Sequence, residues 1–274
     1  MKWDAETLEE WAAEFEGSDV AINLAGRSVN CRYNDGNRRL IKQSRVSSTR
    51  VVGEAIARAN QPPKVWLQAS TATIYAHSYD RDNDEAAGVV GCSEGAPDTW
   101  HFSYDVVASW ERAATEAKTP HTRKALLRTA MVMSPDRGGV FDTLLRLVRF
   151  GLGGRAGDGR QYVSWIHDED FAKSVMWLID HDEFEGPVNL AAPNPVPNEA
   201  FMKALRDAWG IGFGLPATEW MLEIGAFFLQ TETELILKSR RAVPGRLLES
   251  GFTFQFPAWL DAANDLCTRW REIS

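Results

Sequence analysis

The residues whose types and spacing could do chemistry gather in one stretch, 65–75. It begins with bulky apolar residues after the breaker pair Pro62-Pro63, which predicts a buried strand. It then changes to small and hydroxylated residues, among them Ala69, Ser70 and Thr71. Small side chains leave room for a ligand, and hydroxyls offer it hydrogen bonds. Because ligands of open α/β sheets bind at the carboxyl ends of the strands, we expect a ligand site at Thr71.

A second junction of strand and turn lies nearer the start of the chain. Residues 20–24 predict a short core strand that ends in Ala25-Gly26. Gly26 carries no side chain, so the backbone there can lie close to a flat ligand. The alternative, a strand followed by an ordinary turn, stays open.

The elements that must position these residues alternate between strand and helix as far as residue 210. Asp4 is expected to cap a helix ending near Phe15, and Asp168 or Asp170 a helix ending at Ile179. Residues 76–100 predict a long loop over the site. This alternation predicts an α/β fold with a parallel sheet. The other expected helices are 37–60, 102–118, 140–150 and 198–209, and the other expected strands are 124–129, 162–166 and 187–191.

The long helix expected at 37–60 carries several basic residues outside its apolar stripe. Such residues usually form a solvated face of a helix, and we interpret them so. They are Arg38, Arg39, Lys42, Arg45 and Arg50.

The character of the chain changes after Gly210. The run 214–217 (GLPA) introduces two expected helices, 218–229 and 231–241. We expect two regions: residues 1–210 form the α/β part, and residues 211–274 form a small, mainly helical carboxyl-terminal part.

Composition excludes several classes of function. The chain has 30 Lys and Arg against 38 Asp and Glu, a net charge of -8, which argues against nucleic acid or membrane partners. No apolar run approaches the roughly 20 residues that span a bilayer. Cys31, Cys92 and Cys267 are far apart and outside any ligand spacing, which indicates reduced thiols in a cytoplasmic protein.

Five motifs follow one another in a characteristic order. As a set, with the tail around 243–257, they resemble the atypical extended short-chain dehydrogenase/reductases that are called epimerase family proteins. The tail resembles that branch's carboxyl-terminal domain of unknown function, of the DUF1731 type. The motifs are Asn-Leu-Ala-Gly at 23–26, Ser-Thr-x-x-Ile-Tyr at 70–75, Leu-Arg-Thr at 127–129, Ser-Trp-Ile-His-x-x-Asp at 164–170 and Gly-Pro-Val-Asn-Leu at 186–190.

This resemblance implies a Rossmann-like sheet that binds NADP or NAD and a small, sugar-like substrate. In the family, the hydroxyl at the position of Thr71 hydrogen-bonds the reacting group. The resemblance places cofactor contacts at Asn23, Ala25, Gly26, Ala69, Ser70 and Thr129, and substrate contacts at Arg27, Arg160, Trp165 and His167. As lone residues, the arginines and Trp165 would more often be surface charges and a core aromatic. His167 beside Asp168 and Asp170 is more simply a helix start, and we expect no metal, because no second strong ligand has metal spacing.

Two departures from the family pattern matter. Members begin with a glycine-rich strand-turn-helix that holds the cofactor's phosphates, and no Gly-x-x-Gly-x-x-Gly stands near the start here. The family layout therefore predicts an amino-terminally truncated sheet and weak or absent cofactor binding. It also predicts an exposed strand edge at 20–24, through which the chain would form a homodimer or aggregate. The second departure concerns a catalytic Tyr-x-x-x-Lys. In one register the pair is Tyr104 and Ala108, and in another it is Ser103 and Val107. Neither register keeps the lysine.

Three functions remain open at this point. The first is an NAD(P)-dependent oxidoreductase or epimerase with Thr71 and Tyr104 as its candidate catalytic residues. The second is a non-catalytic binding or regulatory protein on a decayed Rossmann scaffold, and the third is an incomplete gene product. Because fold does not fix function, the substrate stays open.

Overall fold

A four-stranded parallel sheet forms the centre of the computed structural model, which describes residues 3–217 and 237–273. Its strands are β1 (Val20–Asn23), β2 (Val65–Thr71), β3 (Arg123–Thr129) and β7 (Gly186–Leu190), in that spatial order. The register aligns Thr71 with Thr129, so β2 and β3 end at the same edge of the sheet. The predicted parallel α/β fold is confirmed.

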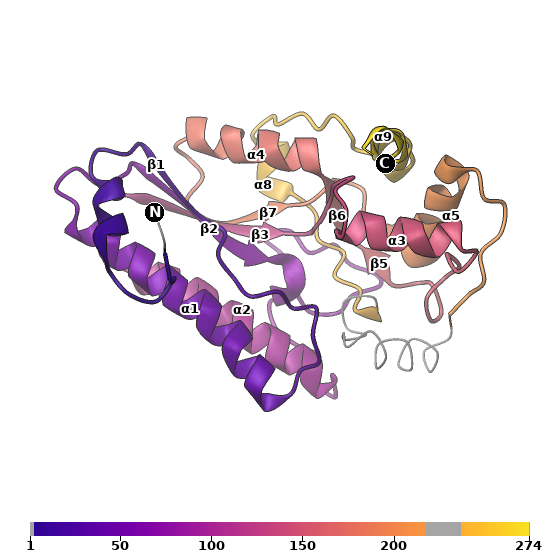
Figure 1. The fold of residues 1–274 in the computed structure, drawn as a ribbon, viewed down its shortest axis with the longest axis horizontal. Coiled ribbons are helices and arrows are strands. Elements are labelled where there is room, and N and C mark those ends of the chain that lie inside the picture. The colour runs from indigo at the N-terminus through magenta and orange to yellow at the C-terminus, as the bar shows by residue number, and fades with distance from the viewer. Residues whose placement is uncertain (1–2, 218–236, 274) are drawn as a thin grey trace.

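Helices cover both faces of this sheet (Figure 1). On one face, α1 (Asp35–Arg58) and α2 (Asp98–Glu116) lie side by side and bury Trp66 and Leu126. On the other face, α4 (Asp168–Asp180) and α8 (Gly245–Glu249) bury the alternate residues Leu67 and Leu127. Because successive side chains of a strand point to opposite faces, the apolar run of β2 serves both layers.

A second hydrophobic core lies beyond the carboxyl ends of the strands. It is built by α3 (Val140–Arg149), α5 (Asn198–Trp209) and α9 (Trp259–Glu272). At its centre the Phe201 and Trp259 rings stack with centroids 3.9 Å apart, and Trp165 meets Trp259 edge-on at 4.9 Å. The chain's last helix is therefore part of this core. Two short strand pairs, β4 (Met131–Met133) with β6 (Trp165–His167) and β5 (Tyr162–Val163) with β8 (Val196–Pro197), connect it to the sheet.

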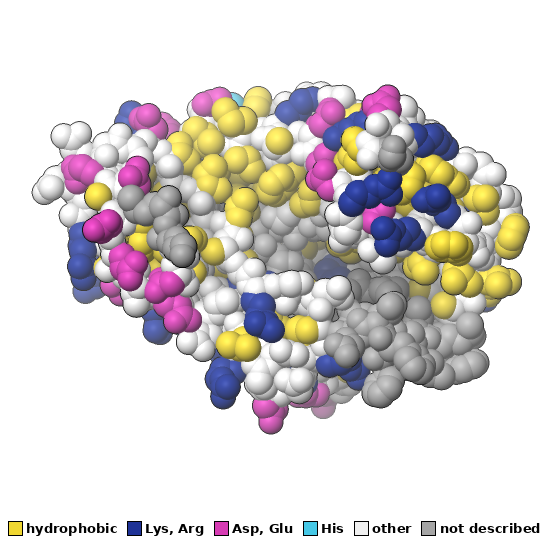
Figure 2. All heavy atoms as spheres, in the orientation of Figure 1, with side chains coloured by type: hydrophobic (Ala, Val, Ile, Leu, Met, Phe, Trp, Pro, Cys, Tyr) yellow, Lys and Arg dark blue, Asp and Glu magenta, His cyan; other side chains and the backbone are white. Residues whose placement is uncertain are grey.

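A basic surface covers part of this second core. Figure 2 shows Lys and Arg side chains gathered over α3 and α9. Three arginines, one each in α3, in α9 and in the turn before α3, stack on tryptophan rings: Arg137 on Trp270 at 3.7 Å, and Arg271 and Arg149 on Trp209 at 4.1 and 5.6 Å. The whole chain has a negative net charge, so a basic surface of this kind means that charge is unevenly distributed over the molecule.

Several local predictions are wrong. The helix expected from Asp4 to Phe15 is only a 3-10 helix, η1 (Glu10–Phe15). The Asp4 carboxylate instead accepts hydrogen bonds from the backbone N–H of Glu6 and Thr7, and Ala5 has a φ of 63°, which no α-helix allows. The helices expected at 218–229 and in 231–236 lie outside the described residues. Residues 238–241, the expected end of the second of these helices, are not helical.

Within residues 3–217 and 237–273, no helix is long and apolar enough to cross a membrane.

Candidate functional site

A cavity of about 330 Å³ opens at the carboxyl ends of β2 and β3. It brings together three of the predicted residues, Ser70, Thr71 and Thr129. The fold explains this meeting, because the register places the ends of both strands side by side. The rest of the described lining consists of Val29, Tyr33, Ile41, Arg45, Ala72, Thr73, Phe102, Ser103, Val106, Val107, Trp110, Ala130, Met131, Ser164 and Arg240.

Thr71 holds the turn that follows β2 and also faces the cavity. Its hydroxyl oxygen accepts a hydrogen bond from the backbone N–H of Thr73 at 3.3 Å and lies 3.2 Å from the Thr73 hydroxyl. When the Thr73 hydroxyl donates to it, Thr71 keeps its own hydroxyl hydrogen for an oxygen in the cavity. Thr71 therefore caps the turn, and with Thr73 as the donor of that bond it is also a hydrogen-bond donor at the site.

Ser103 and Val107 line the cavity, whereas Tyr104 does not. Tyr104 packs instead against the small apolar cluster that contains Tyr75 and Ala242. Ser103 and Val107 are one helical turn apart on the face of α2 that borders the cavity, so both side chains contact it. The geometry favours the register that aligns Ser103 and Val107 with the Tyr-x-x-x-Lys pair over the register that begins at Tyr104.

A buried network holds the floor of the cavity. The Glu111 carboxylate accepts two hydrogen bonds from Arg128, both of 2.8 Å, and one from Ser70 at 2.6 Å. Arg128 also donates to the Tyr75 hydroxyl at 3.2 Å, and that hydroxyl donates to Asn189 at 2.9 Å. Burial raises the pKa of Tyr75, so its phenol stays neutral at physiological pH. The network ties β2, β3, β7 and α2 together at the edge where the site lies.

The remaining candidate cofactor contacts lie around the end of β1. Asn23 is buried, donates to Gln68 at 3.0 Å and accepts from the backbone N–H of Ala25 at 3.0 Å. A Cβ added to Gly26 would lie 3.2 Å from the guanidinium carbon of Arg45, so a larger residue here would require the Arg45 side chain to shift by a few tenths of an ångström. Ala69 is half-buried in β2 and does not line the cavity.

The four candidate substrate contacts are not in the described lining. Arg27 and Arg160 are exposed, and Arg160 lies over the Tyr79 ring at 5.4 Å. Trp165 and His167 are fully buried. Trp165 belongs to the second hydrophobic core, which agrees with the alternative of a core aromatic.

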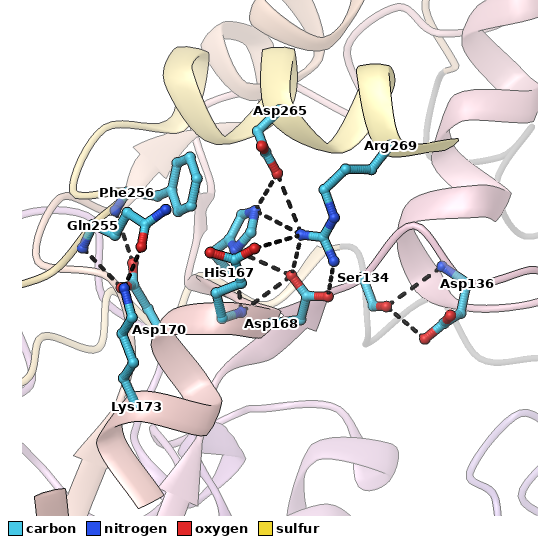
Figure 3. Close-up of polar contacts among 11 residues, drawn as sticks. Ser134, Asp136, His167, Asp168, Asp170, Lys173, Gln255, Phe256, Asp265 and Arg269 are labelled. Carbon is cyan, nitrogen blue, oxygen red and sulfur yellow. Dashed lines mark hydrogen bonds and ion pairs between the residues drawn. The ribbon is translucent and has the colours of Figure 1, made fainter. Parts of the chain in front are cut away.

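His167 caps a helix and joins it to the end of the chain (Figure 3). Its Nδ1 accepts from the backbone N–H of Glu169 at 3.2 Å, so His167 itself is the N-cap of α4, and the prediction of Asp168 or Asp170 as the cap is wrong. Because Nδ1 is an acceptor, Nε2 carries the hydrogen, and it donates to Asp265 of α9 at 3.0 Å. Phe256 stacks on the imidazole at 3.9 Å.

Charged groups reinforce this junction. Arg269 of α9 donates two hydrogen bonds to Asp168, of 2.9 and 2.7 Å. The buried carboxylate of Asp170 accepts from the backbone N–H of Gln255 and Phe256 at 2.8 and 2.9 Å. Asp168 thus fastens α9, and Asp170 the segment just before it, to the start of α4, as the sticks in Figure 3 show. Among the described residues, no group of three His, Cys, Asp or Glu side chains could hold a metal ion.

Sequence reasoning missed two arginines of the cavity, Arg45 and Arg240. The interpretation of Arg45 as part of a solvated face is wrong. Its Nη1 donates to the carbonyls of Arg27 and Ile41 at 3.0 and 3.1 Å, and its burial lowers its pKa. The segment after β1 folds over α1 and covers Arg45, a contact that helical periodicity cannot reveal. For Arg240, the signal was the basic run 238–241 close to the family's tail motif.

The chain is similar to known proteins over most of its length. Residues 3–191 match the family described as NAD dependent epimerase/dehydratase, and residues 217–266 match the domain of unknown function DUF1731. Epimerase family protein SERP0438 of Staphylococcus epidermidis is 30% identical over 260 residues, which are 94% of this chain and 82% of that protein.

Two solved structures extend this likeness to the fold. The human epimerase family protein SDR39U1 (isoform 2), solved with NADPH, superposes with a TM-score of 0.82 at 27% identity, over 94% of this chain and 85% of that one. A nucleoside-diphosphate sugar epimerase from Corynebacterium glutamicum superposes with a TM-score of 0.74 at 27% identity. The match covers 99% of this chain and 52% of that longer one.

Proposed function

The chain belongs to the NAD dependent epimerase/dehydratase family, and from this premise we propose that it is an NAD(P)-dependent oxidoreductase or epimerase acting on a small, sugar-like molecule. The observation that carries the proposal is the cavity at the ends of β2 and β3, where Ser70, Thr71 and Thr129 meet. Its volume of about 330 Å³ is in the range of small-molecule sites. Both NADP and NAD remain candidates, and we propose a cytoplasmic location, since no disulfide joins the three cysteines.

The residues present fit a dinucleotide laid across the strand ends. We propose that Asn23, Ala25 and Gly26 lie under its adenine and ribose, because they stand at the carboxyl end of β1, the edge at which open α/β sheets bind ligands. The nicotinamide would lie near Thr71 and Thr129, beside Ser70, whereas Ala69 lies outside the described lining. When bound, this cofactor supplies or accepts a hydride.

Thr71 is the residue that we propose to contact the reacting oxygen of the substrate. Its hydroxyl hydrogen is available to the cavity while Thr73 donates to its oxygen. A hydrogen bond to an oxygen that gains negative charge stabilises the transition state more than the ground state. Tyr104 packs outside the cavity, so we base the proposal on Thr71 and leave Tyr104 as the less favoured of the two predicted catalytic residues.

Calorimetric titration with NADPH up to millimolar concentration tests the cofactor assignment. We expect binding weaker than micromolar, because the printed sequence has no glycine-rich turn to hold the phosphates with backbone amides. Thr129→Val should weaken it further, whereas Thr143→Val, on the outer surface of α3, should not. No heat of binding at millimolar NADPH would overturn the assignment. Turnover is then sought with nucleotide sugars and simple sugars, by absorbance at 340 nm for a net oxidation or reduction and by NMR of the sugar for epimerisation, which leaves the cofactor unchanged overall.

A non-catalytic binding protein is the second candidate, and one observation favours it. The cavity positions that correspond to the family's Tyr and Lys hold Ser103 and Val107, neither of which exchanges a proton near neutral pH. NADPH binding without turnover of any compound in the panel would support this candidate. If turnover of a compound in the panel is retained in Ser103→Ala and lost in Thr71→Val, a purely non-catalytic function is excluded.

A further inference from the structure

The motif Ser-Trp-Ile-His at 164–167 contributes one residue to the cavity, and it is not one of those that the family resemblance singled out. Trp165 and His167 are buried outside the described lining, whereas Ser164 lines the cavity. Ser164 is itself buried. Because buried hydroxyls are normally hydrogen-bonded, the partners of Ser164 indicate what a ligand must supply.

The backbone holds the Ser164 oxygen and leaves its hydrogen uncommitted. The oxygen accepts a hydrogen bond from the N–H of Ala242 at 2.8 Å. The hydroxyl hydrogen has no acceptor among the residues that the structure describes. Since a hydroxyl can donate one bond while it accepts another, Ser164 remains a donor at the cavity.

The backbone acceptors beside Ser164 are already engaged. The Ser164 carbonyl accepts from the N–H of Met131 at 3.2 Å, and the Trp165 carbonyl accepts from the N–H of Ala192 at 2.6 Å. The described lining contains no carboxylate, amide or imidazole side chain that could accept instead. At Ser164 the cavity therefore favours a ligand atom that accepts a hydrogen bond and has no hydrogen of its own to place.

The hydroxyls at the strand ends are arranged differently. Ser70 donates to Glu111 at 2.6 Å, and Thr129 donates to the carbonyl of Leu127 at 3.1 Å, so both oxygens are left as acceptors. Thr71 adds a donor beside them when Thr73 donates to its oxygen. A donor and acceptors in one place suit a group that is a carbonyl in one redox state and a hydroxyl in the other.

These two places are separated along the direction of the strands. Thr71 and Thr129 are paired in the register of β2 and β3. Met131 lies two residues beyond Thr129, and its N–H bonds to Ser164. Two residues of a strand rise by roughly 7 Å. A small ring with oxygens on opposite sides is long enough to contact both places.

We propose that Ser164 is a specificity-determining residue, whose hydroxyl donates to a carbonyl oxygen of the substrate at the end opposite the reacting group. The substrate class is then a small molecule with a carbonyl at that end, such as a keto sugar, and not one whose oxygens are all hydroxyls. A ligand hydroxyl at Ser164 would lose the water that accepts its hydrogen without gaining another acceptor. The role of the bound molecule as a substrate rests on the proposed function, whereas the preference for a carbonyl oxygen does not.

Titration of the full chain with three probes of one size, in the absence of cofactor, tests this preference. The probes are 1,4-cyclohexanedione, 4-hydroxycyclohexanone and trans-1,4-cyclohexanediol, and ligand-observed NMR measures their dissociation constants. The two ketones should bind about equally, because the hydroxyketone can turn its carbonyl to Ser164 and its hydroxyl to the strand ends. The diol should bind about 10-fold more weakly, the effect of one unsatisfied polar group.

Ser164→Ala should remove the preference, because both ketones fall to the affinity of the diol while the diol itself changes little. The diol thus serves as an internal control for a shift of Ala242, whose N–H loses its acceptor in this variant. Ser174→Ala is the matched control. Ser174 is also buried, donates to the carbonyl of Asp170 at 2.7 Å in α4 and is not in the described lining, so this variant should keep the preference.

The outcomes separate this proposal from the cofactor assignment. Equal affinity of the wild-type protein for the three probes, or binding of none, would overturn it without any variant. A preference that persists in Ser164→Ala, or an equal loss for all three probes there, would overturn it as well. NADPH binding without the preference would leave the cofactor assignment standing, and the preference without NADPH binding would leave only the carbonyl contact. Circular dichroism verifies that both variants are folded.

Discussion

The Glu111 carboxylate and the Arg128 guanidinium form two hydrogen bonds of 2.8 Å beneath the cavity, with side-chain exposures of 11% and 8%. Glu111 belongs to α2 and Arg128 to β3, so the pair joins the helix layer to the sheet. The same carboxylate accepts the Ser70 hydroxyl. The Ser70 hydroxyl of the site is therefore positioned by a buried ion pair that is not part of the described cavity lining.

Breaking this pair from one side should be costly. Arg128→Met leaves the Glu111 charge buried without its partner, and we expect the free energy of unfolding to fall by about 3 kcal/mol. Urea denaturation measures it. Lys203→Met removes one member of the exposed Lys203–Asp207 pair and should change the stability by less than about 0.5 kcal/mol. Equal effects of the two substitutions would contradict the structural role of Arg128.

His167 should behave as a structural cap rather than a ligand residue. His167→Ala removes the acceptor for the Glu169 N–H and the bond to Asp265, so we expect a loss of about 2 kcal/mol of stability. His167→Asn retains an N-cap acceptor and should recover part of this loss. Thermal unfolding of both variants checks the order. Affinity for NADPH should be unchanged in whatever fraction stays folded, and a specific loss of affinity at full stability would place His167 at the cofactor site and contradict a purely structural role.

Cys267 should be inert towards thiol reagents in the folded protein. Burial raises its pKa from 9.0 to about 11, while Cys31 and Cys92 are partly exposed. Because the pKa of this thiol is higher in the folded than in the unfolded chain, its contribution to the free energy of unfolding is fully present below pH 9. That contribution is lost as the pH rises towards 11. At pH 8, a chromogenic disulfide should therefore modify Cys31 and Cys92 quickly and Cys267 only after denaturation. Rapid reaction of Cys267 in the native state would show that α9 opens readily.

Thr71→Val tests the proposed catalytic hydroxyl. The substitution keeps the volume but removes a hydrogen bond to an oxygen that gains charge, so turnover should fall about 100-fold if the protein is an enzyme. It also removes the acceptor for the Thr73 N–H. Thr71→Ser keeps both functions and should retain most of the turnover at similar stability. Full turnover in Thr71→Val would mean that the residue serves only the turn after β2.

The sequence predicts the sheet well because its strands are apolar runs between breakers. The spans 20–24, 124–129 and 187–191 all fall on strands of the structure within about a residue. It also places Ser70, Thr71 and Thr129 near one another, since carboxyl ends of parallel strands share an edge. A helical repeat at Trp259, Leu266 and Trp270 could have revealed α9, which the motif-based interpretation left unassigned.

What the sequence could not predict depends on contacts between distant segments. Arg45 has the same local pattern as its exposed neighbours, and only the turn after β1 distinguishes it by covering it. His167 caps α4 because Asp265, 98 residues later, accepts its Nε2 hydrogen and fixes its ring. At Asp4, a side chain competes with the helix for backbone donors, and a single-residue preference cannot show which interaction is the stronger.

The open edge of β1 leads to a prediction about association. Within the described residues, β1 pairs with β2 on one side and with no strand on the other. Ile22 and Leu24 are 48% and 59% exposed, and an apolar hollow of about 260 Å³ beside them is lined by Trp3, Trp11 and Phe15 among others. An uncharged strand edge next to apolar side chains can pair with a second copy.

We expect a concentration-dependent dimer through β1, measured by light scattering with size-exclusion chromatography. Ile22→Lys should raise the dimer's dissociation constant about 10-fold or more, because a charge at the edge must be desolvated on pairing. Leu260→Lys, a comparably exposed leucine at 47% on α9, should leave it unchanged. A wild-type chain that stays monomeric at every concentration would rule out pairing at this edge.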